Sequence, residues 1–141
     1  MKTKTFMIIV IFFFISCTDR NEKEYRNYSV EINNSTSVGL TIEGYNSENN
    51  LIINNSIESN SIGAECNYQA EIFSGYICGA DSIVIKFSNG KGYICDLRES
   101  GNILCLPSKF IFSEQGFINL NNNNYQFVIT EDDYNNAYVL P

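Results

Sequence analysis

The amino-acid sequence predicts an all-β fold, an antiparallel β-sandwich or a barrel-like single domain with a short C-terminal helix. Three observations predict it. Apolar and polar residues alternate with a period of two in several short stretches, as in strands with one buried face. Turn-forming residues separate these stretches at close intervals, and twenty asparagines are spread over the chain. Helical periodicity is almost absent before residue 130. An open sheet covered by loops is the alternative architecture.

The chain has the length of one domain. Of its 141 residues, 1–16 have the pattern of a removable signal, which leaves 125 residues and favours a single hydrophobic core. Residues 17–26 are polar and charged, which predicts a tether, and residues 27–141 form the predicted β domain. The formal net charge of −7 disfavours nucleic acid as a partner, because phosphate binding needs clustered Lys and Arg.

The individual strands follow from the alternation. Residues 82–87 give the strongest strand pattern, because β-branched side chains fill their centre. The turn between the first two strands is predicted at Asn33–Ser35. The predicted strands are residues 28–32, 38–42, 51–53, 82–87, 92–97, 103–106, 109–112, 117–120 and 125–130.

The register of the central hairpin can be predicted because a slip of one residue would turn its apolar face outward. The odd positions of residues 82–87 and of residues 92–97 are apolar, and a three-residue loop at 89–91 would place both sets on one face. Lys86 and Asp96 then point outward. The predicted opposed pairs, all on the buried face, are Phe87 with Tyr93, Ile85 with Cys95 and Ile83 with Leu97.

The C-terminal segment predicts a short helix that begins after Thr130. Thr130 can cap the helix, and the acidic residues 131–133 lie where the helix dipole favours negative charge. Tyr134, Ala137 and Tyr138 would share one face. Because so short a helix is marginal in isolation, we expect it to form by docking that face on the sheet.

The N-terminus has the three parts of an export signal. Lys2 and Lys4 precede ten apolar residues, a run about half as long as a membrane-spanning helix needs. Residues Phe14-Ile15-Ser16-Cys17 resemble the lipobox of bacterial lipoproteins, which implies acylation of Cys17, palmitate included. The acids at 19, 22 and 24 are similar to signals that send Bacteroidetes lipoproteins to the outer face of the outer membrane. The predicted location is therefore the cell envelope, as an outer-membrane lipoprotein.

Four cysteines remain once Cys17 carries lipid, and an oxidising compartment predicts two disulfides among them. Three connectivities are possible by count. Spacing favours Cys95 with Cys105, which are symmetric about Ser100 as in a hairpin, and this leaves Cys66 to pair with Cys78. A zinc site is the alternative, but the spacings lack the short C-x2-C pairs that such sites usually show.

Sequence patterns for catalysis are weak. The chain has no His, which excludes Ser-His and Cys-His pairs and His-ligated metals, and no cofactor or metal is expected. Residues 131–133 with the asparagines 121–124 could bind calcium, but a helix start explains the acids better. Asp81 with Asp96 or Glu99 could form a carboxylate pair, although nothing fixes their separation. Ser82, in Asp81-Ser82-Ile83, is similar to the O-glycosylation pattern of exported Bacteroidetes proteins, and a strand start is the simpler interpretation.

Three stretches look like a family of small uncharacterised Bacteroidetes lipoproteins. They are residues 37–45, residues 81–91 and residues 129–137. The resemblance implies a cellular location and a fold, and the three stretches contain no known catalytic residue of the family. We therefore expect a non-enzymatic, lipid-anchored envelope protein that binds an unknown protein or glycan or serves a surface-structural role. The alternative is an inhibitor of an envelope-directed enzyme such as lysozyme, since an acidic body suits a basic target.

Overall fold

The protein is a two-sheet β structure, seen in a computed structural model that describes residues 23–98 and 104–141. Its elements are β1 (Arg26–Ser35), β2 (Leu40–Tyr45), β3 (Leu51–Ile57), β4 (Ser61–Ala70), β5 (Ser82–Phe87), β6 (Lys91–Asp96), β7 (Phe117–Asn121), β8 (Asn124–Thr130), α1 (Glu131–Asn135) and β9 (Tyr138–Val139). One sheet has the order β4-β1-β8-β7 and the other β3-β2-β5-β6-β9. The predicted all-β, sandwich-like fold with a short C-terminal helix is confirmed.

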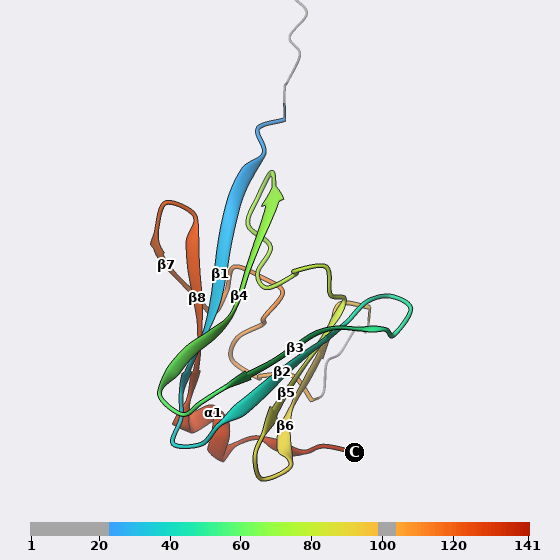
Figure 1. Cartoon of the computed structure of the whole chain (residues 1–141), viewed down its shortest axis with the longest axis vertical. Helices are drawn as coiled ribbons and strands as arrows, with labels where there is room; N and C mark the ends of the chain where they lie inside the picture. The colour runs from blue at the N-terminus through green and yellow to red at the C-terminus, as the bar shows by residue number, and fades with distance from the viewer. Residues whose placement is uncertain (1–22, 99–103) are drawn as a thin grey trace, which may run out of the picture.

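The core lies between the inner faces of the two sheets, whose strands cross at an angle in Figure 1. Val30 and Ile32 of β1 and Ile83 and Ile85 of β5 are fully buried in it. All strand pairs but one are antiparallel, and the exception is β1 with β8, which run parallel. This parallel pair joins strands from the two ends of the chain. As a result, the N-terminal strand β1 lies inside the four-stranded sheet, between β4 and β8.

The predicted register of the β5–β6 hairpin is wrong by two residues, although its buried face is right. Ile85 lies opposite Tyr93 and Ile83 opposite Cys95. The loop is residues 88–90, one residue earlier than predicted, because Gly90 takes the left-handed conformation (φ 81°) that a three-residue hairpin loop requires at its last position. Leu97 consequently falls beyond the end of β6 and is 46% exposed, against the prediction that it is buried.

Other strand predictions need correction. Residues 104–106 and 109–112 are not strands. β9 pairs with the start of β6 on the edge away from β5, and residues 104–105 are joined to β6 by the hydrogen bond from the Ile94 N–H to the Leu104 carbonyl and by the Cys95–Cys105 disulfide. The predicted pairing of Leu97 with Ile103 lies outside the described residues. The sequence reading missed β4, because a bulge at Ala64 (φ 51°) interrupts its alternation.

The predicted helix begins at its predicted cap. The Thr130 hydroxyl accepts a hydrogen bond from the Asp133 N–H, and Asp133 accepts one in return from the Thr130 N–H. The helix ends at Asn135, so Ala137 and Tyr138 lie beyond it and the predicted helical face is not continuous. Docking is nevertheless confirmed: Tyr134 packs on Phe87 with ring centroids 5.1 Å apart, and Ala137 is buried. Within the described chain α1 is the sole helix, and it is too short to cross a membrane.

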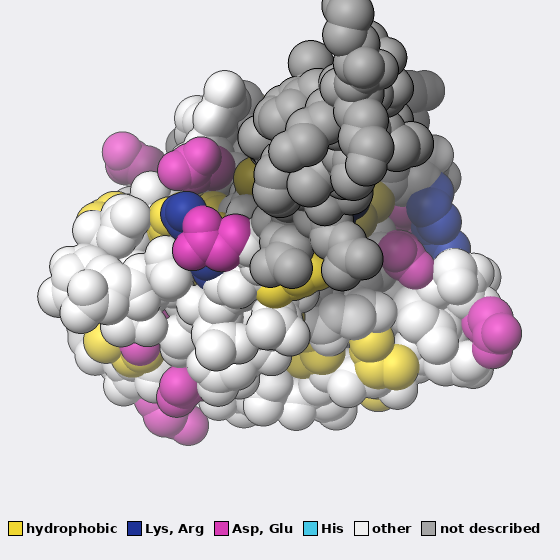
Figure 2. All heavy atoms as spheres, turned by 90° about the horizontal axis from the view of Figure 1, so that it is seen from above, with side chains coloured by type: hydrophobic (Ala, Val, Ile, Leu, Met, Phe, Trp, Pro, Cys, Tyr) yellow, Lys and Arg dark blue, Asp and Glu magenta, His cyan; other side chains and the backbone are white. Residues whose placement is uncertain are grey.

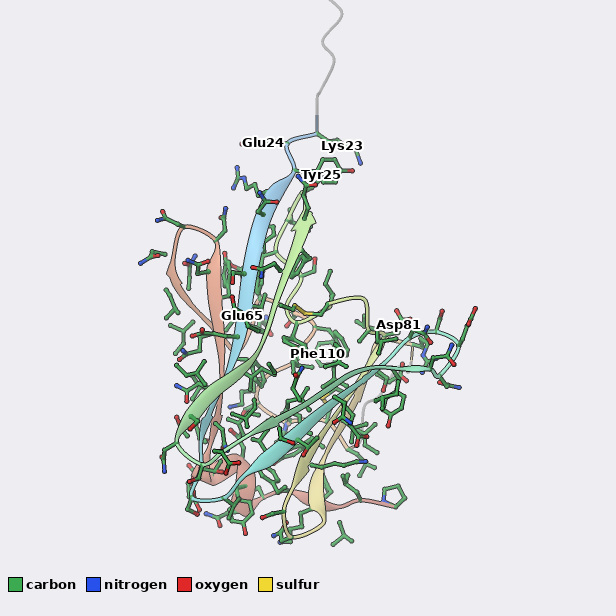
Figure 3. All side chains as sticks on the ribbon, in the orientation of Figure 1. Lys23, Glu24, Tyr25, Glu65, Asp81 and Phe110 are labelled. Atoms are coloured by element: carbon green, nitrogen blue, oxygen red, sulfur yellow. A yellow bond between two sulfur atoms is a disulfide. The ribbon has the colours of Figure 1, made fainter. Side chains whose placement is uncertain are left out.

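The end of the domain where the chain enters β1 carries an aromatic cluster covered by a loop. Figure 3 shows Lys23, Glu24 and Tyr25 at this end. Phe73, from the loop between β4 and β5, stacks on Tyr125 of β8 with centroids 3.7 Å apart and contacts Tyr28 of β1. The Cys66–Cys78 disulfide fastens this loop to β4. The loop thereby closes the part of the four-stranded sheet that the other sheet does not cover.

Candidate ligand-binding face

The structure contains the two disulfides that spacing favoured. Cys66 is bonded to Cys78 with a Cα–Cα distance of 6.1 Å, and Cys95 to Cys105 with 4.7 Å. The first pair is partly exposed and the second is buried. Cys17, the signal and residues 17–22 of the tether lie outside the described residues. The zinc alternative does not apply to cysteines that are bonded to each other.

The acidic groups considered for calcium or catalysis are separated or already engaged. Residues 121–124 and 131–133 lie at opposite ends of β8, a seven-residue strand about 20 Å long. Asp133 accepts hydrogen bonds from Lys109 and Thr130, and within residues 23–98 and 104–141 no group of three potential metal ligands occurs. Asp96 is bonded to Arg98, and Glu99 lies outside the described residues.

Ser82 lies at the start of β5 opposite Asp96 and is 7% exposed. Its burial agrees with the interpretation as a strand start. O-glycosylation of Ser82 stays a prediction, and a glycan there would have to be accommodated beside β2 and β6, which flank β5 on both sides.

A shallow hollow of about 230 Å³ lies on the outer face of the five-stranded sheet, where the end of β3, the start of β2 and the end of β5 adjoin. Its polar side chains come from all three strands and their ends, and a glycine is among its lining residues. We call these residues the hollow: Gly39, Thr41, Ser56, Glu58, Lys86 and Ser88.

Gly39 lines the hollow and has no side chain to fill it. A Cβ placed on Gly39 would lie 3.6 Å from the Ile57 carbonyl oxygen and 4.0 Å from a Glu58 carboxylate oxygen, which are ordinary contact distances. Gly39 does not have a positive φ, so a larger residue fits its backbone. A positive φ is therefore not the reason for a glycine at position 39, and a side chain added there would lie at the wall of the hollow.

Next to the hollow, Glu43, Tyr45 and Lys86 form a bonded cluster on the same face. Lys86 Nζ donates to Glu43 Oε1 at 2.8 Å, and the Tyr45 hydroxyl donates to Glu43 Oε2 at 2.6 Å. The hydrogen bond from Lys86, then that from Tyr45, lowers the pKa of Glu43, and the bond to Glu43 raises the pKa of Tyr45. Near neutral pH the glutamate is thus ionised and the phenol protonated. The cluster offers fixed charges and donors, which suit binding better than proton transfer.

The turns around the hollow are held by a buried asparagine. The Asn34 Nδ2 donates to the carbonyls of Val38, Ile57 and Glu58 at 2.8, 3.2 and 2.9 Å. The Asn34 Oδ1 accepts from the Thr36 N–H and hydroxyl. One side chain therefore ties the β1–β2 turn to the β3–β4 turn. The prediction of a turn at Asn33–Ser35 is wrong, because β1 continues to Ser35.

The helix α1 contacts the β1–β2 turn at the same end of the domain. The Glu131 carboxylate accepts hydrogen bonds from the Ser37 N–H at 2.8 Å and the Ser37 hydroxyl at 3.0 Å. Figure 1 shows α1 and these turns at the end opposite the one where the chain enters β1. The acids predicted to start the helix thus also order the turn that leads into Gly39.

Charge is dispersed over the end of the molecule nearer the tether. In the view of Figure 2, acidic side chains lie in several separate places and not in one patch. The hollow, in contrast, gathers polar and charged side chains from three strands in one place, and it is taken as the candidate site.

The fold and the two disulfides define a small, disulfide-stabilised β domain of the kind found in oxidising compartments. No protein-family model, no curated protein and no solved structure matches the chain. Sequence reasoning missed the hollow, since Gly39 and Glu58 become neighbours only through strand pairing. The one available signal was a glycine directly before an alternating strand.

Proposed function

We propose that this protein is a lipid-anchored envelope protein whose β domain binds a small polar group, such as one sugar unit of a glycan, in the hollow. The observation that carries the proposal is the placement of the hollow. The tether enters β1 at one end of the domain, and β1 runs ten residues, about 30 Å, to the end where α1 and the hollow lie. A ligand could therefore reach the hollow while the other end is held at a membrane.

Support for the anchor comes from the sequence and from the disulfides. The Ser16-Cys17 junction after the apolar run resembles a lipoprotein signal. Disulfides are typical of proteins exported to an oxidising compartment. Several acyl chains on one cysteine provide stable attachment, since each buried CH2 contributes about 0.8 kcal/mol. The similarity to small Bacteroidetes lipoproteins belongs to the same proposal.

We expect Cys17→Ser to abolish membrane attachment, because serine cannot form the thioether on which lipoprotein anchoring depends. Cells fed a radiolabelled fatty acid should label the wild type and not the variant, and the variant should leave the membrane fraction. Cys66→Ser with Cys78→Ser is the matched control: it removes two other cysteines, which form a disulfide, and leaves the label in place. Equal labelling of Cys17→Ser and wild type would contradict the anchor.

The chemistry of the hollow indicates the class of ligand. Thr41 and Ser56 present hydroxyls 3.4 Å apart, Glu58 presents a carboxylate and Lys86 an ammonium group. Sugar hydroxyls both donate and accept, so they match a site that mixes donors and acceptors. About 230 Å³ is smaller than the roughly 300–1,000 Å³ of sites for drug-sized ligands, which favours one ring over an extended chain.

Filling the hollow tests the ligand proposal. The mature chain with Cys17→Ser is screened against a glycan array, and hits are titrated by NMR. We expect Gly39→Val to weaken binding about tenfold or more, because its side chain occupies the ligand's space without straining the backbone. Gln69→Val, on the outer face of the other sheet, is the matched control and should bind as wild type.

Two outcomes would oppose the glycan proposal. Gly39→Val that binds every hit as tightly as wild type would show that the ligand lies elsewhere. A stoichiometric complex with lysozyme or another basic hydrolase, without any glycan binding, would favour the inhibitor alternative.

A further inference from the structure

The four sheet edges differ in how they are protected against pairing with another strand. β9 has only two residues, β7 is short and bulged, and β4 carries the bulge at Ala64 followed by the exposed Glu65. Short strands, bulges and charges are the usual protections of an edge. β3 has a bulge at its first residues and then five regular residues, Ile53–Ile57, with none of these protections.

The outward edge of β3 is unpaired. Among the described residues, the backbone of residues 53–56 pairs with β2 on one side and with nothing on the other. Figure 1 shows β3 and β4 diverging from the turn that connects them. Leu51 and Ile52, at the start of β3, are 49% and 46% exposed. An uncharged edge flanked by exposed apolar side chains is a template for strand addition.

We infer that β3 pairs with β3 of a second copy of this chain, antiparallel and centred on Asn55, to form a symmetric dimer. The absence of charge along β3 removes the main electrostatic obstacle to pairing with a second copy. The chain carries a net charge of −7, yet no charged residue occurs between Glu48 and Glu58, so two copies meet here without opposing acids. Centring on Asn55 places Glu58 opposite Ile52 of the partner, whereas parallel pairing would place the two Glu58 carboxylates side by side.

The two-fold axis of such a pair is perpendicular to the sheet. Ile53 then lies opposite Ile57 of the partner on the inner face, and the outer faces continue into one ten-stranded sheet. Both hollows face the same side. The two-fold axis places the starts of both β1 strands at the same height along it, so the pairing does not depend on anchoring.

Introducing a charge at Asn55 tests the dimer. The probe is the mature chain with Cys17→Ser, so that no lipid drives association, and the measurement is its mass by analytical ultracentrifugation over a wide range of concentration. Wild type should shift from monomer to dimer. Asn55→Lys and Asn55→Glu should each weaken dimerisation roughly tenfold or more, because like charges come to lie directly opposite. An equal mixture of the two should recover a one-to-one dimer.

Ile118→Lys on the edge of β7 is the matched control, since Ile118 is also exposed on an uncharged edge strand, and its dimer should match wild type. Unchanged thermal melting of the Asn55 variants, measured at a concentration where wild type is monomeric, shows that the monomer fold is kept. The inference is overturned if wild type stays monomeric or forms open-ended fibres, if the mixture does not recover the dimer, or if Ile118→Lys dissociates it. The Asn55 variants are also tested for glycan binding. If they bind glycan as wild type does, the proposed function stands whether or not the dimer forms.

Discussion

Replacing Cys95 and Cys105 together by serine should lower the free energy of unfolding by roughly 4 kcal/mol, within the 2–5 kcal/mol typical of native disulfides. The bond closes a loop of sequence separation 10, for which chain entropy alone predicts roughly 3 kcal/mol. The remainder arises because Cys95 and Cys105 are buried, so the variant places two hydroxyls among apolar side chains. Urea unfolding of the oxidised proteins measures the difference.

Cys66→Ser with Cys78→Ser is the matched comparison. Its loop has a similar separation of 12, so the entropic effect should be nearly equal. Both cysteines are partly exposed, however, so serine hydroxyls at these positions are expected to be hydrated. We therefore expect a smaller loss, roughly 2–3 kcal/mol. Equal losses in the two double variants would show that burial of the second disulfide contributes nothing.

Asn34→Ala should destabilise the domain by roughly 3 kcal/mol or more. Asn34 is 0% exposed, and its amide satisfies three carbonyl groups and two donors of the neighbouring turns. Alanine would leave these groups without their partner, at about 1–3 kcal/mol for each buried group left unpaired. Thermal and urea unfolding measure the loss, and hydrogen exchange should show the amides around residue 36 losing protection first.

Two further substitutions sharpen the test at Asn34. Asn34→Asp keeps the acceptor for Thr36 but turns a carboxylate toward three carbonyl oxygens, so we expect it to cost more than alanine. Asn33→Ala removes a side chain that bonds Gln126 on the outer face of the four-stranded sheet, and it should change the free energy of unfolding by no more than about 0.5 kcal/mol. A mild Asn34→Ala variant would contradict the role of this side chain in joining the two turns.

Strand predictions succeeded where the alternation is regular and failed where the backbone departs from it. Residues 82–87 were predicted with the bounds of β5, because β-branched side chains fill the centre and Ile83, Ile85 and Phe87 fall on the period of two. β4 was not predicted, because its bulge breaks the alternation: Ile62 lies on the outer face and Cys66 on the inner face of the sheet. A bulge at Ala64 has no local signature, since alanine rarely adopts a positive φ.

The candidate site was largely beyond prediction from sequence. Gly39, Ser56 and Lys86 are far apart along the chain, and only the order β3-β2-β5 brings them together. The same holds for Lys109, whose ammonium group reaches Asp133 at 2.6 Å from a segment that was predicted to be a strand. Pairing of distant strands depends on the packing of the whole core, which local patterns do not encode.

The sequence by itself determined the all-β class, the cap of the C-terminal helix and the favoured cysteine pairing, because each depends on residues close together in the chain: alternation, Thr130 with the acids behind it, and short cysteine separations. Only the tertiary structure decided the parallel pairing of β1 with β8, the burial of Asn34 and the open edge of β3. These features depend on which strands become neighbours, and that choice is made by burying one shared core.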